Sequence, residues 1–495
     1  MKNLELFIQS LPNVLHPEEF GVYPLSINQV GKMWVFMLNE GSHDSLIVVN
    51  DESNLFQGSL VKKGNVQYLK AELTHENGNA LRKLFPFTKP IPVLNKMRSF
   101  GLGDRLGISG PGHIKTFKNY DAYPVFVQQS IRELNLTNRT YEEVLDSATF
   151  FVFRDGYKDG FGADGDHLKK PQEIEYALSL GFTMVTLDCS DYINNEVGQM
   201  TSNQIDKSIV LDEPIKQKYL NKVFKVETSK VTFDETELKR CVLIYGKAID
   251  YASLIYDKYF KNADNKVNFE ISIDETATPT SPAQHYFVAN ELKEKGVVLD
   301  TMAPRFIGEF QKGVDYVGDI DAFEKELIVH AAIARHFGYK LSIHSGSDKF
   351  SIFKLIGKHT QGHFHVKTAG TNWLEAMRLV SHYDPKLYRD IHKYALKMFQ
   401  EAKKFYHVTT DLSKIADVDT LTDQQLTELF NQNDARQLIH ITYGYILNAK
   451  DNDGKYLFKD QLYKLWRKEA EAYADMLSKH ISKHLDLLYS GFENK

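Results

Sequence analysis

The segment FGADGDHLKKPQEIEYALSLGFTMVTLD, residues 161–188, decides the fold, because it has the pattern of a strand, a helix and a second strand. We predict strands at 161–166 and 183–188, and the amphipathic residues between them predict a helix. Two strands joined by a helix of this length form a βα unit, in which neighbouring strands run parallel. This segment therefore indicates an α/β protein with a parallel sheet.

The same alternation repeats along most of the chain. Eight predicted strands are each followed by a plausible helix, at 100–104, 124–128, 161–166, 183–188, 267–274, 297–301, 340–344 and 363–367. Eight units with right-handed crossovers predict a closed (β/α)8 barrel of the TIM type, over residues 96–384. A doubly wound open sheet is the alternative.

Three regions lie outside the simple repeat. Residues 1–95 contain short apolar runs separated by Gly, Asn and Asp, which predict a small β-rich N-terminal domain and a linker. The interval 192–250 is too long for a bare connection and predicts an insertion over the barrel mouth. Residues 385–495 keep a helical period, which predicts a C-terminal helical extension packed on the barrel.

Composition restricts the possible partners. The formal net charge is −5 and no long block of Lys and Arg occurs, so nucleic acid is not an expected partner. No uninterrupted apolar segment suits secretion or membrane insertion, and we expect a cytoplasmic protein without a membrane partner. Cys189 and Cys241 are the only cysteines, so any metal must rely on His, Asp and Glu. The composition does not distinguish a monomer from a homo-oligomer.

Ionisable residues stand at the ends of predicted strands, where barrel enzymes have their active sites. The third strand ends before His167, the seventh ends in His344 and the eighth contains His365. These three are the preferred ligands of a divalent cation such as Zn, Mn, Ni or Co. For Glu309 two interpretations have equal weight: a fourth metal ligand, or a carboxylate that belongs only to its loop.

Two carboxylates on separate strands, Asp166 and Glu270, are the candidates for proton transfer, because they could approach a substrate from two sides. The structural alternatives are a helix cap for Asp166 and a core ion pair for Glu270.

Two Gly-rich segments, 101–113 and 345–349, follow the first and seventh predicted strands. Such loops place backbone N–H groups near an anion, with Arg105, Lys349 and Lys367 as charge partners. Neither segment matches a dinucleotide or Walker motif, so a substrate carboxylate or phosphate is favoured over a nucleotide. A purely structural turn is the alternative.

Four motifs together resemble the tagaturonate/fructuronate epimerase family of hexuronate catabolism. They are SFGLGDRLG at 99–107 with PGH at 111–113, GADGDHLK at 162–169, SGSDKF at 345–350 and HVKTAGT at 365–371. The resemblance implies a barrel enzyme that uses a divalent metal to interconvert D-tagaturonate and D-fructuronate at C4.

The resemblance also implies roles for individual residues. Asp166 would be the proton acceptor and Glu270 the opposing acid. His167 and His344 would be metal ligands, with His365 or Glu309 completing the set. Binding of the keto-uronate would fall to the residues of the motifs and their charge partners: Arg105, Lys349, Lys367 and Thr371.

The C4 hydrogen of a 2-keto sugar acid is β to the carbonyl, so simple enolisation does not reach it. We therefore expect retro-aldol cleavage between C3 and C4 followed by re-addition, with direct proton transfer as the alternative. Two other functions fit the same sequence: a metal-dependent sugar-acid isomerase or aldolase, and a non-catalytic sugar-acid-binding protein.

Overall fold

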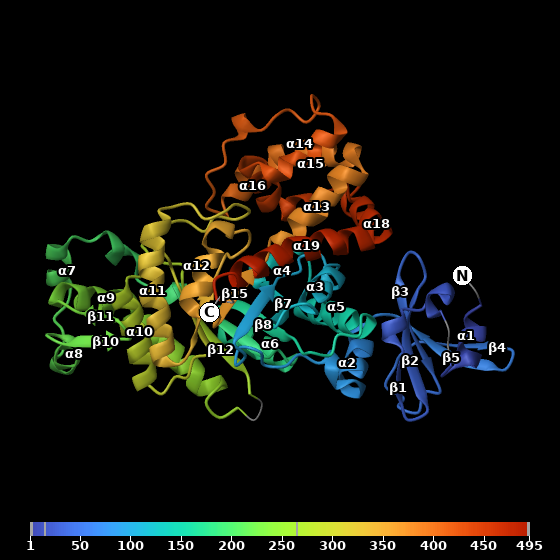
Figure 1. Cartoon of the computed structure of the whole chain (residues 1–495), viewed down its shortest axis with the longest axis horizontal. Helices are drawn as coiled ribbons and strands as arrows, with labels where there is room; N and C mark the ends of the chain where they lie inside the picture. The colour runs from blue at the N-terminus through green and yellow to red at the C-terminus, as the bar shows by residue number, and fades with distance from the viewer. Residues whose placement is uncertain (1–2, 14–15, 264–265, 493–495) are drawn as a thin grey trace.

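The computed structural model describes residues 3–13, 16–263 and 266–492, so the predicted terminal regions are described except for residues 1–2, 14–15 and 493–495. Its centre is a closed parallel barrel of eight strands (Figure 1), which confirms the predicted TIM-type fold. Pairing of the last strand with the first closes the barrel. In chain order the strands are β6 (Arg98–Leu102), β7 (Tyr123–Ser130), β8 (Gly162–Leu168), β9 (Met184–Asp188), β12 (Asn268–Ile273), β13 (Thr301–Pro304), β14 (Lys340–Ile343) and β15 (Phe364–Thr368).

Helices surround the barrel and shield its strands from solvent. Their starts follow local capping rules: Thr140 and Ser281 each accept a hydrogen bond from the third residue of the helix that follows them. The surrounding helices are α3 (Gly110–Phe117), α4 (Ile131–Thr137), α5 (Tyr141–Arg154), α6 (Pro171–Ser179), α9 (Glu235–Tyr259), α10 (Pro282–Glu294), α11 (Ile320–Phe337), α12 (Phe350–Thr360) and α13 (Thr371–Tyr383).

Two predicted strands are displaced from their observed positions. The sixth was expected at 297–301, but β13 occupies Thr301–Pro304. Gly296 has a φ of 78°, and the Asp300 carboxylate accepts a hydrogen bond from Phe269 N, so the residues between them form a connection. The first strand ends at Leu102 instead of residue 104, because the Asp104 carboxylate accepts three backbone N–H groups of the following loop.

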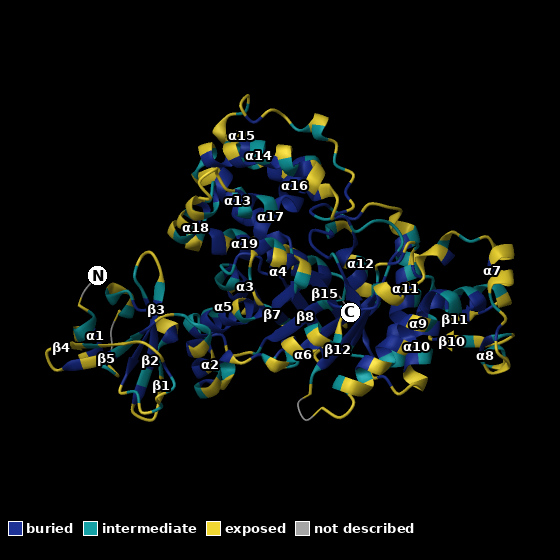
Figure 2. Ribbon diagram, turned by 180° about the vertical axis from the view of Figure 1, so that it is seen from behind, coloured by how far each residue is buried: buried dark blue, intermediate teal, exposed yellow. Residues whose placement is uncertain are grey.

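The N-terminal region is an antiparallel sheet in the order β1-β2-β3-β5-β4, which confirms a small β-rich region. Alternating side chains bury both faces. Phe36 and Ile47 pack on Phe7 of α1 (Leu4–Ser10), whereas Val35 packs toward Phe153 of α5. The remaining elements are β1 (Asn28–Val30), β2 (Met33–Asn39), β3 (Asp44–Val49), β4 (Ser59–Lys63), β5 (Val66–Ala71) and α2 (His75–Leu84). Figure 2 shows this buried sheet beside the barrel.

Most of the predicted insertion lies at the side of the barrel, while its first turn reaches the barrel mouth through Asp191. Its hairpin, β10 (Val223–Val226) and β11 (Ser229–Thr232), contacts α11 and α10. Phe224 lies 4.7 Å from the Tyr286 ring of α10, and this aromatic packing fixes the hairpin on the outer helices. The insertion also contains η4 (Ser190–Tyr192), η5 (Asn195–Gln199), α7 (Ser202–Ser208) and α8 (Glu213–Tyr219).

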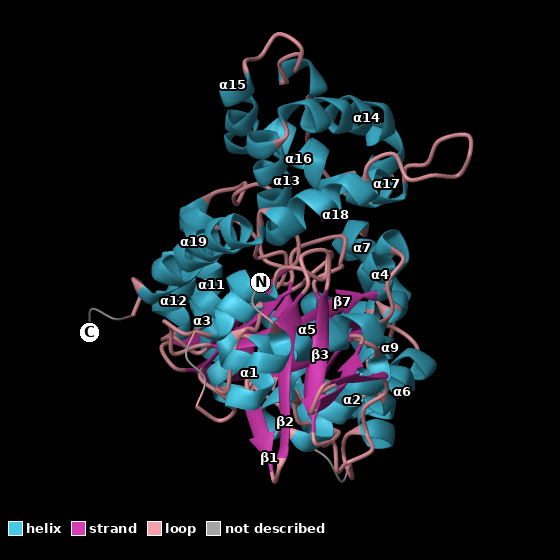
Figure 3. Ribbon diagram, turned by 90° about the vertical axis from the view of Figure 1, so that its right-hand side faces the viewer, coloured by secondary structure: helices cyan, strands magenta, loops and turns pink. Residues whose placement is uncertain are grey.

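The C-terminal extension is helical, as predicted, and stands beyond the carboxyl ends of the strands (Figure 3). Its last helix contacts α3, α12 and α13. Arg436 donates to the Gly313 carbonyl and to Asp348, in loops that follow β13 and β14. The extension contains α14 (Pro385–Lys403), α15 (Asp423–Glu428), α16 (Asn433–Ile441), α17 (Tyr443–Asn448), α18 (Lys459–Lys468) and α19 (Ala470–Tyr489).

Short 3-10 turns complete the secondary structure, at η1 (Pro17–Phe20), η2 (Pro24–Ser26), η3 (Pro86–Thr88), η6 (Leu412–Lys414) and η7 (Leu429–Asn431). Within the described ranges, no helix has the length and apolar character needed to cross a bilayer.

Candidate active site

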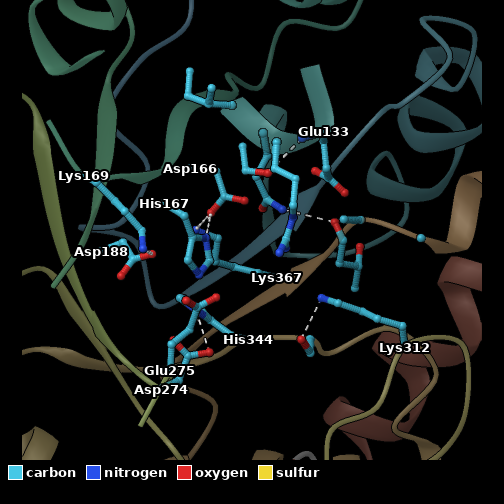
Figure 4. A pocket seen from close by; sticks show the side chains of 18 of the residues that line it. Glu133, Asp166, His167, Lys169, Asp188, Asp274, Glu275, Lys312, His344 and Lys367 are labelled. Atoms are coloured by element: carbon cyan, nitrogen blue, oxygen red, sulfur yellow. Dashed lines mark hydrogen bonds and ion pairs between the residues drawn. The ribbon is translucent and has the colours of Figure 1, made fainter. Parts of the chain in front are cut away.

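A cavity of about 520 Å³ opens at the carboxyl ends of the barrel strands (Figure 4). Its size suits a small polar molecule. Charged side chains dominate its wall, and they come from the carboxyl ends of the barrel strands and from the loops and helix starts that follow them. The lining residues used below are Arg105, Arg132, Glu133, Asp166, His167, Lys169, Lys170, Asp188, Asp274, Lys312, His344, Ser345 and Lys367.

Three side chains in this cavity converge in the manner of metal ligands. One ligand atom each from His167, Asp274 and His344 lies within 4.8 Å of the other two. The rings of His167 and His344 are 4.9 Å apart between centroids, and His344 Nδ1 is 3.3 Å from Asp274 Oδ2. We call these three residues the cavity triad.

The backbone of β8 explains how Asp166 and His167 both face the cavity although they are consecutive. Successive side chains of a regular strand point to opposite faces. The register of β8 against β9 shifts between Gly165 and Leu168, and His167 has a φ of 55° in the left-handed region. A non-glycine residue in this conformation is strained, and such strain persists where the surrounding structure holds it in place.

The electrostatics of the triad favour an added positive charge. Burial alone would lower the pKa of His344, but the carboxylates of Asp274 and Glu270 raise it to about 10. Glu270 Oε1 is 2.8 Å from His344 Nε2. Likewise, the pKa of His167 is raised by Asp166, against the effect of burial. Without a metal, a proton on His344 therefore balances the nearby negative charge.

The cavity triad fits a catalytic divalent cation. Two imidazoles and one carboxylate are a common donor set for Zn, Mn, Fe, Co and Ni, and three protein ligands leave positions open for substrate. His344 Nδ1 is buried and accepts or donates no hydrogen bond in the described chain. A buried nitrogen without a hydrogen bond, 3.3 Å from the Asp274 carboxylate, suits a metal-ligand position.

Beside the triad, Lys367 connects three carboxylates in the floor of the cavity. Its Nζ lies 2.7 Å from Asp164 Oδ2, 2.5 Å from Asp166 Oδ1 and 3.2 Å from Glu270 Oε1. Burial alone would lower the pKa of Lys367, but these carboxylates raise it well above its usual value, so the side chain remains a cation. Lys367, predicted to bind substrate, thus serves first to hold the carboxylates in place.

The two predicted proton-transfer residues lie at different depths. Asp166 lines the cavity, and its Oδ1 is 2.8 Å from His167 Nδ1. Glu270 is fully buried and accepts hydrogen bonds from Thr186 and Thr301. Burial alone would raise both pKa values, but Lys367 with its neighbouring histidines holds them well below their usual range. Both groups are therefore carboxylates near neutral pH.

The structure does not bring Glu309 or His365 into the triad. Glu309 is 42% exposed, lies 3.3 Å from His407 Nε2 and pairs with Gln311. His365 is fully buried, its Nδ1 is 3.0 Å from Ser99 Oγ, and burial lowers its pKa to about 3. His365 points into the barrel two residues before Lys367, so it lies below the triad instead of beside it.

The other three predicted substrate-binding residues are buried, and two of them are paired with other groups of the protein. Arg105 lines the cavity but is paired with Glu133 at 2.6 Å and stacks 4.0 Å from the Tyr443 ring. Lys349 is fully buried, donates to the carbonyls of Gln311, Val314 and Ser347, and has a pKa lowered by burial to about 7. Thr371 is buried at the start of α13.

Sequence reasoning did not select Asp274 as a metal ligand, although a signal for it exists. It ends the predicted fifth strand, at the position that supplies ligands from the other strands. Lys312 was also missed, and it lies in the loop between β13 and α11 with no motif around it. Lys312 comes beside the cavity through the tertiary course of this loop, which no sequence pattern indicates.

A closed barrel with converging imidazoles and carboxylates at its strand ends belongs to the class of barrel enzymes that act on small polar substrates. The family model for tagaturonate epimerase matches residues 23–488. The chain therefore belongs to the tagaturonate epimerase family and is an isomerase of the epimerase type.

Individual relatives agree with this assignment. A tagaturonate/fructuronate epimerase of Thermotoga maritima is 42% identical over 476 residues, which cover 95% of this chain and 97% of the relative. Crystal structures of a fructuronate-tagaturonate epimerase from Cohnella laeviribosi, native and with one glycerol, share 48% identity with a TM-score of 0.92. Each match covers 98% of this chain. It covers 98% of the native Cohnella chain and 99% of the glycerol-bound one.

Proposed function

We propose that the protein interconverts D-tagaturonate and D-fructuronate by inverting C4, with a divalent cation held by the cavity triad. The observation that supports this most is the placement of Asp166, a carboxylate in the cavity wall, directly beside the triad residue His167. The named activities of the relatives supply the substrate pair. A cation bound to His167, Asp274 and His344 would supply Lewis-acid polarisation of the substrate's C2 carbonyl.

The stereochemistry requires more than enolisation. The C4 hydrogen is β to the C2 carbonyl, so removing it gives no stabilised carbanion. In the proposed path Asp166 accepts the proton of the C4 hydroxyl, C4 becomes an aldehyde carbon, and the C3–C4 bond breaks. The bonding electron pair moves into an enediol(ate) spanning C2 and C3. All atoms remain in the cavity, and no oxidant or reductant is needed.

Re-addition then sets the new configuration. The aldehyde fragment turns so that its other face meets C3, the C3–C4 bond re-forms, and Asp166 returns the proton to the C4 oxygen. Lys367 would keep Asp166 deprotonated before each turnover and hold its carboxylate in place through the 2.5 Å ion pair. Glu270 would orient His344 from below through the 2.8 Å contact with its Nε2.

Proton NMR in D₂O tests the function and the mechanism together. Protein stripped with a chelator and reloaded with Mn, Zn, Ni, Co or Mg is incubated with D-tagaturonate. We expect D-fructuronate with protium retained at C4, and no conversion without metal. Deuterium at C4 would replace the retro-aldol path by direct proton transfer. An aldose product would indicate an isomerase, and free fragments would indicate an aldolase.

Failure of every metal to give turnover would contradict the proposal. Tight binding of the keto-acid without conversion would then identify a sugar-acid-binding protein. The Asp166→Asn protein, loaded with the same metal, is the matched control for contaminating activity.

A further inference from the structure

The cations that line the cavity differ in how far their charge is already balanced. Lys169 pairs with Asp191 at 2.9 Å and Asp188 at 3.5 Å. Lys367 and Arg105 have the carboxylate partners described above. Lys312 and Arg132, by contrast, make no ion pair with a carboxylate in the part of the chain that the structure describes.

These two unpaired cations are neighbours. Lys312 Nζ donates to Ser345 Oγ at 2.9 Å, and the Arg132 guanidinium lies 5.3 Å from the Tyr406 ring. Burial and the positive charges of Arg132 and Arg105 lower the pKa of Lys312, against the opposite effect of Glu133 and Asp274. Lys312 is half-buried and Arg132 is exposed, and two like charges held close together favour an anion that contacts both. The pair therefore has the electrostatics of a carboxylate-binding site.

Their position relates this place to the chemistry. Both residues line the main cavity and an adjoining recess of about 270 Å³, and the recess also borders Asp274 and His344. Ser345, the partner of Lys312, directly follows the triad residue His344 and has a φ of 50°. In Figure 4, Lys312 enters from the side opposite Lys169 and Asp188, with Asp166 and His344 between them.

We infer that Lys312 and Arg132 form an anion subsite that binds the C6 carboxylate of the substrate and selects keto-acids over neutral ketoses. This inference rests on the proposed function for the identity of the acid. The substrate then lies with C6 at Lys312 and C1 toward Lys169 and Asp188, where charges are already balanced. C4 falls between the two ends, on the side of Asp166.

Binding of an unreactive acid tests the subsite without requiring turnover. D-galactonate and galactitol differ only by carboxylate against hydroxymethyl, and their affinities for the metal-loaded protein are measured by calorimetry and by competition. We expect Lys312→Met and Arg132→Met each to weaken galactonate binding by about 10- to 100-fold, the usual effect of losing a charge-assisted hydrogen bond. Galactitol binding should change by less than about threefold.

Two further variants separate a specific subsite from a general effect of charge. Lys170→Met removes an exposed cation at the cavity rim next to Lys169 that forms no ion pair within the described ranges, and it should leave galactonate binding within about threefold of wild type. Lys312→Arg keeps the charge and should restore most of the affinity that Lys312→Met loses.

The inference would be overturned if Lys312→Met weakened galactonate and galactitol equally, or if Lys170→Met matched it. A protein that binds galactonate through Lys312 but does not epimerise D-tagaturonate would retain the subsite and contradict the proposed function alone. When turnover is present, the same selectivity should appear as a 10- to 100-fold lower kcat/KM for D-tagaturonate in Lys312→Met.

Discussion

Two clusters of aspartate and histidine in this protein look alike by composition but differ in their surroundings. In the cavity triad, ligand atoms of His167, Asp274 and His344 lie within 4.8 Å of one another, and the same is true of Asp348, His480 and His484. We call the second set the buried cluster. It joins the loop after β14 to helix α19.

The buried cluster is already complete. Asp348 accepts from Arg436 Nη2 at 2.6 Å and pairs with His480 Nε2 at 2.5 Å. Its own backbone N–H donates to His484 Nε2 at 3.0 Å, so the lone pair of that nitrogen is used. Arg436 supplies the positive charge that a metal would otherwise bring. Among the described residues, no lysine or arginine forms an ion pair with the cavity triad, and the triad lines a cavity.

The comparison shows that open positions and unbalanced charge, more than residue types, distinguish a metal site from a structural network. Asp348 has a φ of 64°, and the buried cluster holds this strained residue in the loop that also contains Ser345 and Lys349. It therefore stabilises the fold around the site without taking part in the chemistry.

Removing one histidine from each cluster should give the largest difference in metal binding between them. His344→Gln should lower metal affinity by more than about 100-fold, the upper range for losing only an outer partner of a ligand, and abolish turnover. His484→Gln should still bind one metal ion per chain. Metal content after gel filtration, measured by mass spectrometry, gives the result. Equal loss of metal in both variants would contradict the assignment.

Asp166→Asn separates catalysis from metal binding within the cavity. The amide keeps the shape of the side chain but cannot accept the C4 hydroxyl proton, so kcat should fall by about 10²- to 10⁴-fold. Metal content should stay at the wild-type level. Steady-state kinetics on metal-loaded protein checks this, and an unchanged kcat would exclude Asp166 as the proton acceptor.

Asp348→Asn should lower the stability of the fold and leave metal binding unchanged. Breaking a buried ion pair leaves Arg436 without its partner, and the free energy of unfolding should fall by about 3–5 kcal/mol. Metal stoichiometry should remain that of the wild type. Denaturant unfolding with a metal assay on the folded fraction tests both points. Loss of metal at wild-type stability would reverse the roles of the two clusters.

The number of protons released on metal binding gives a further test of the cavity triad. The pKa of His344 is raised from 6.5 to about 10, so its protonated form stabilises the metal-free fold fully below pH 6.5. That contribution is lost as pH rises through about 10. Metal binding near pH 8 should therefore release about one proton from His344. Calorimetry in buffers of different ionisation enthalpy measures it, and zero release would contradict a protonated His344.

The smallest effect is expected outside both clusters. Glu309→Gln should change metal affinity by less than about twofold, because this side chain is 42% exposed, lies outside the cavity triad and pairs with His407 and Gln311. Metal titration of the variant checks this. A loss comparable to that of His344→Gln would restore Glu309 as a ligand in a different loop conformation.

The sequence predicts the barrel well because the signal is repeated. In each predicted strand and helix, apolar residues recur with the period typical of that element. Eight such βα units together predict one closed barrel. The sixth strand was misplaced because the apolar residues after Gly296 resemble a strand, although the Asp300 side chain makes them a connection. The insertion was misplaced because aromatic contacts such as that of Phe224 with Tyr286 are long-range.

Strand ends identified part of the candidate site for a similar reason. His167, His344 and Asp166 lie at carboxyl ends, which meet on one face of any such barrel. The depth of a side chain is harder to predict: His365 and Glu270 follow the same rule but lie below the cavity. The buried cluster could not be predicted, because His480 and Asp348 are 132 residues apart and meet only through the packing of α19.

Anomalous X-ray diffraction from crystals grown with Zn²⁺ or Mn²⁺ tests the central claim most directly. We predict one strong peak between His167, Asp274 and His344, and none at Asp348, His480 and His484. A peak at the buried cluster, or a cavity triad without metal at a concentration that supports turnover, would contradict the account.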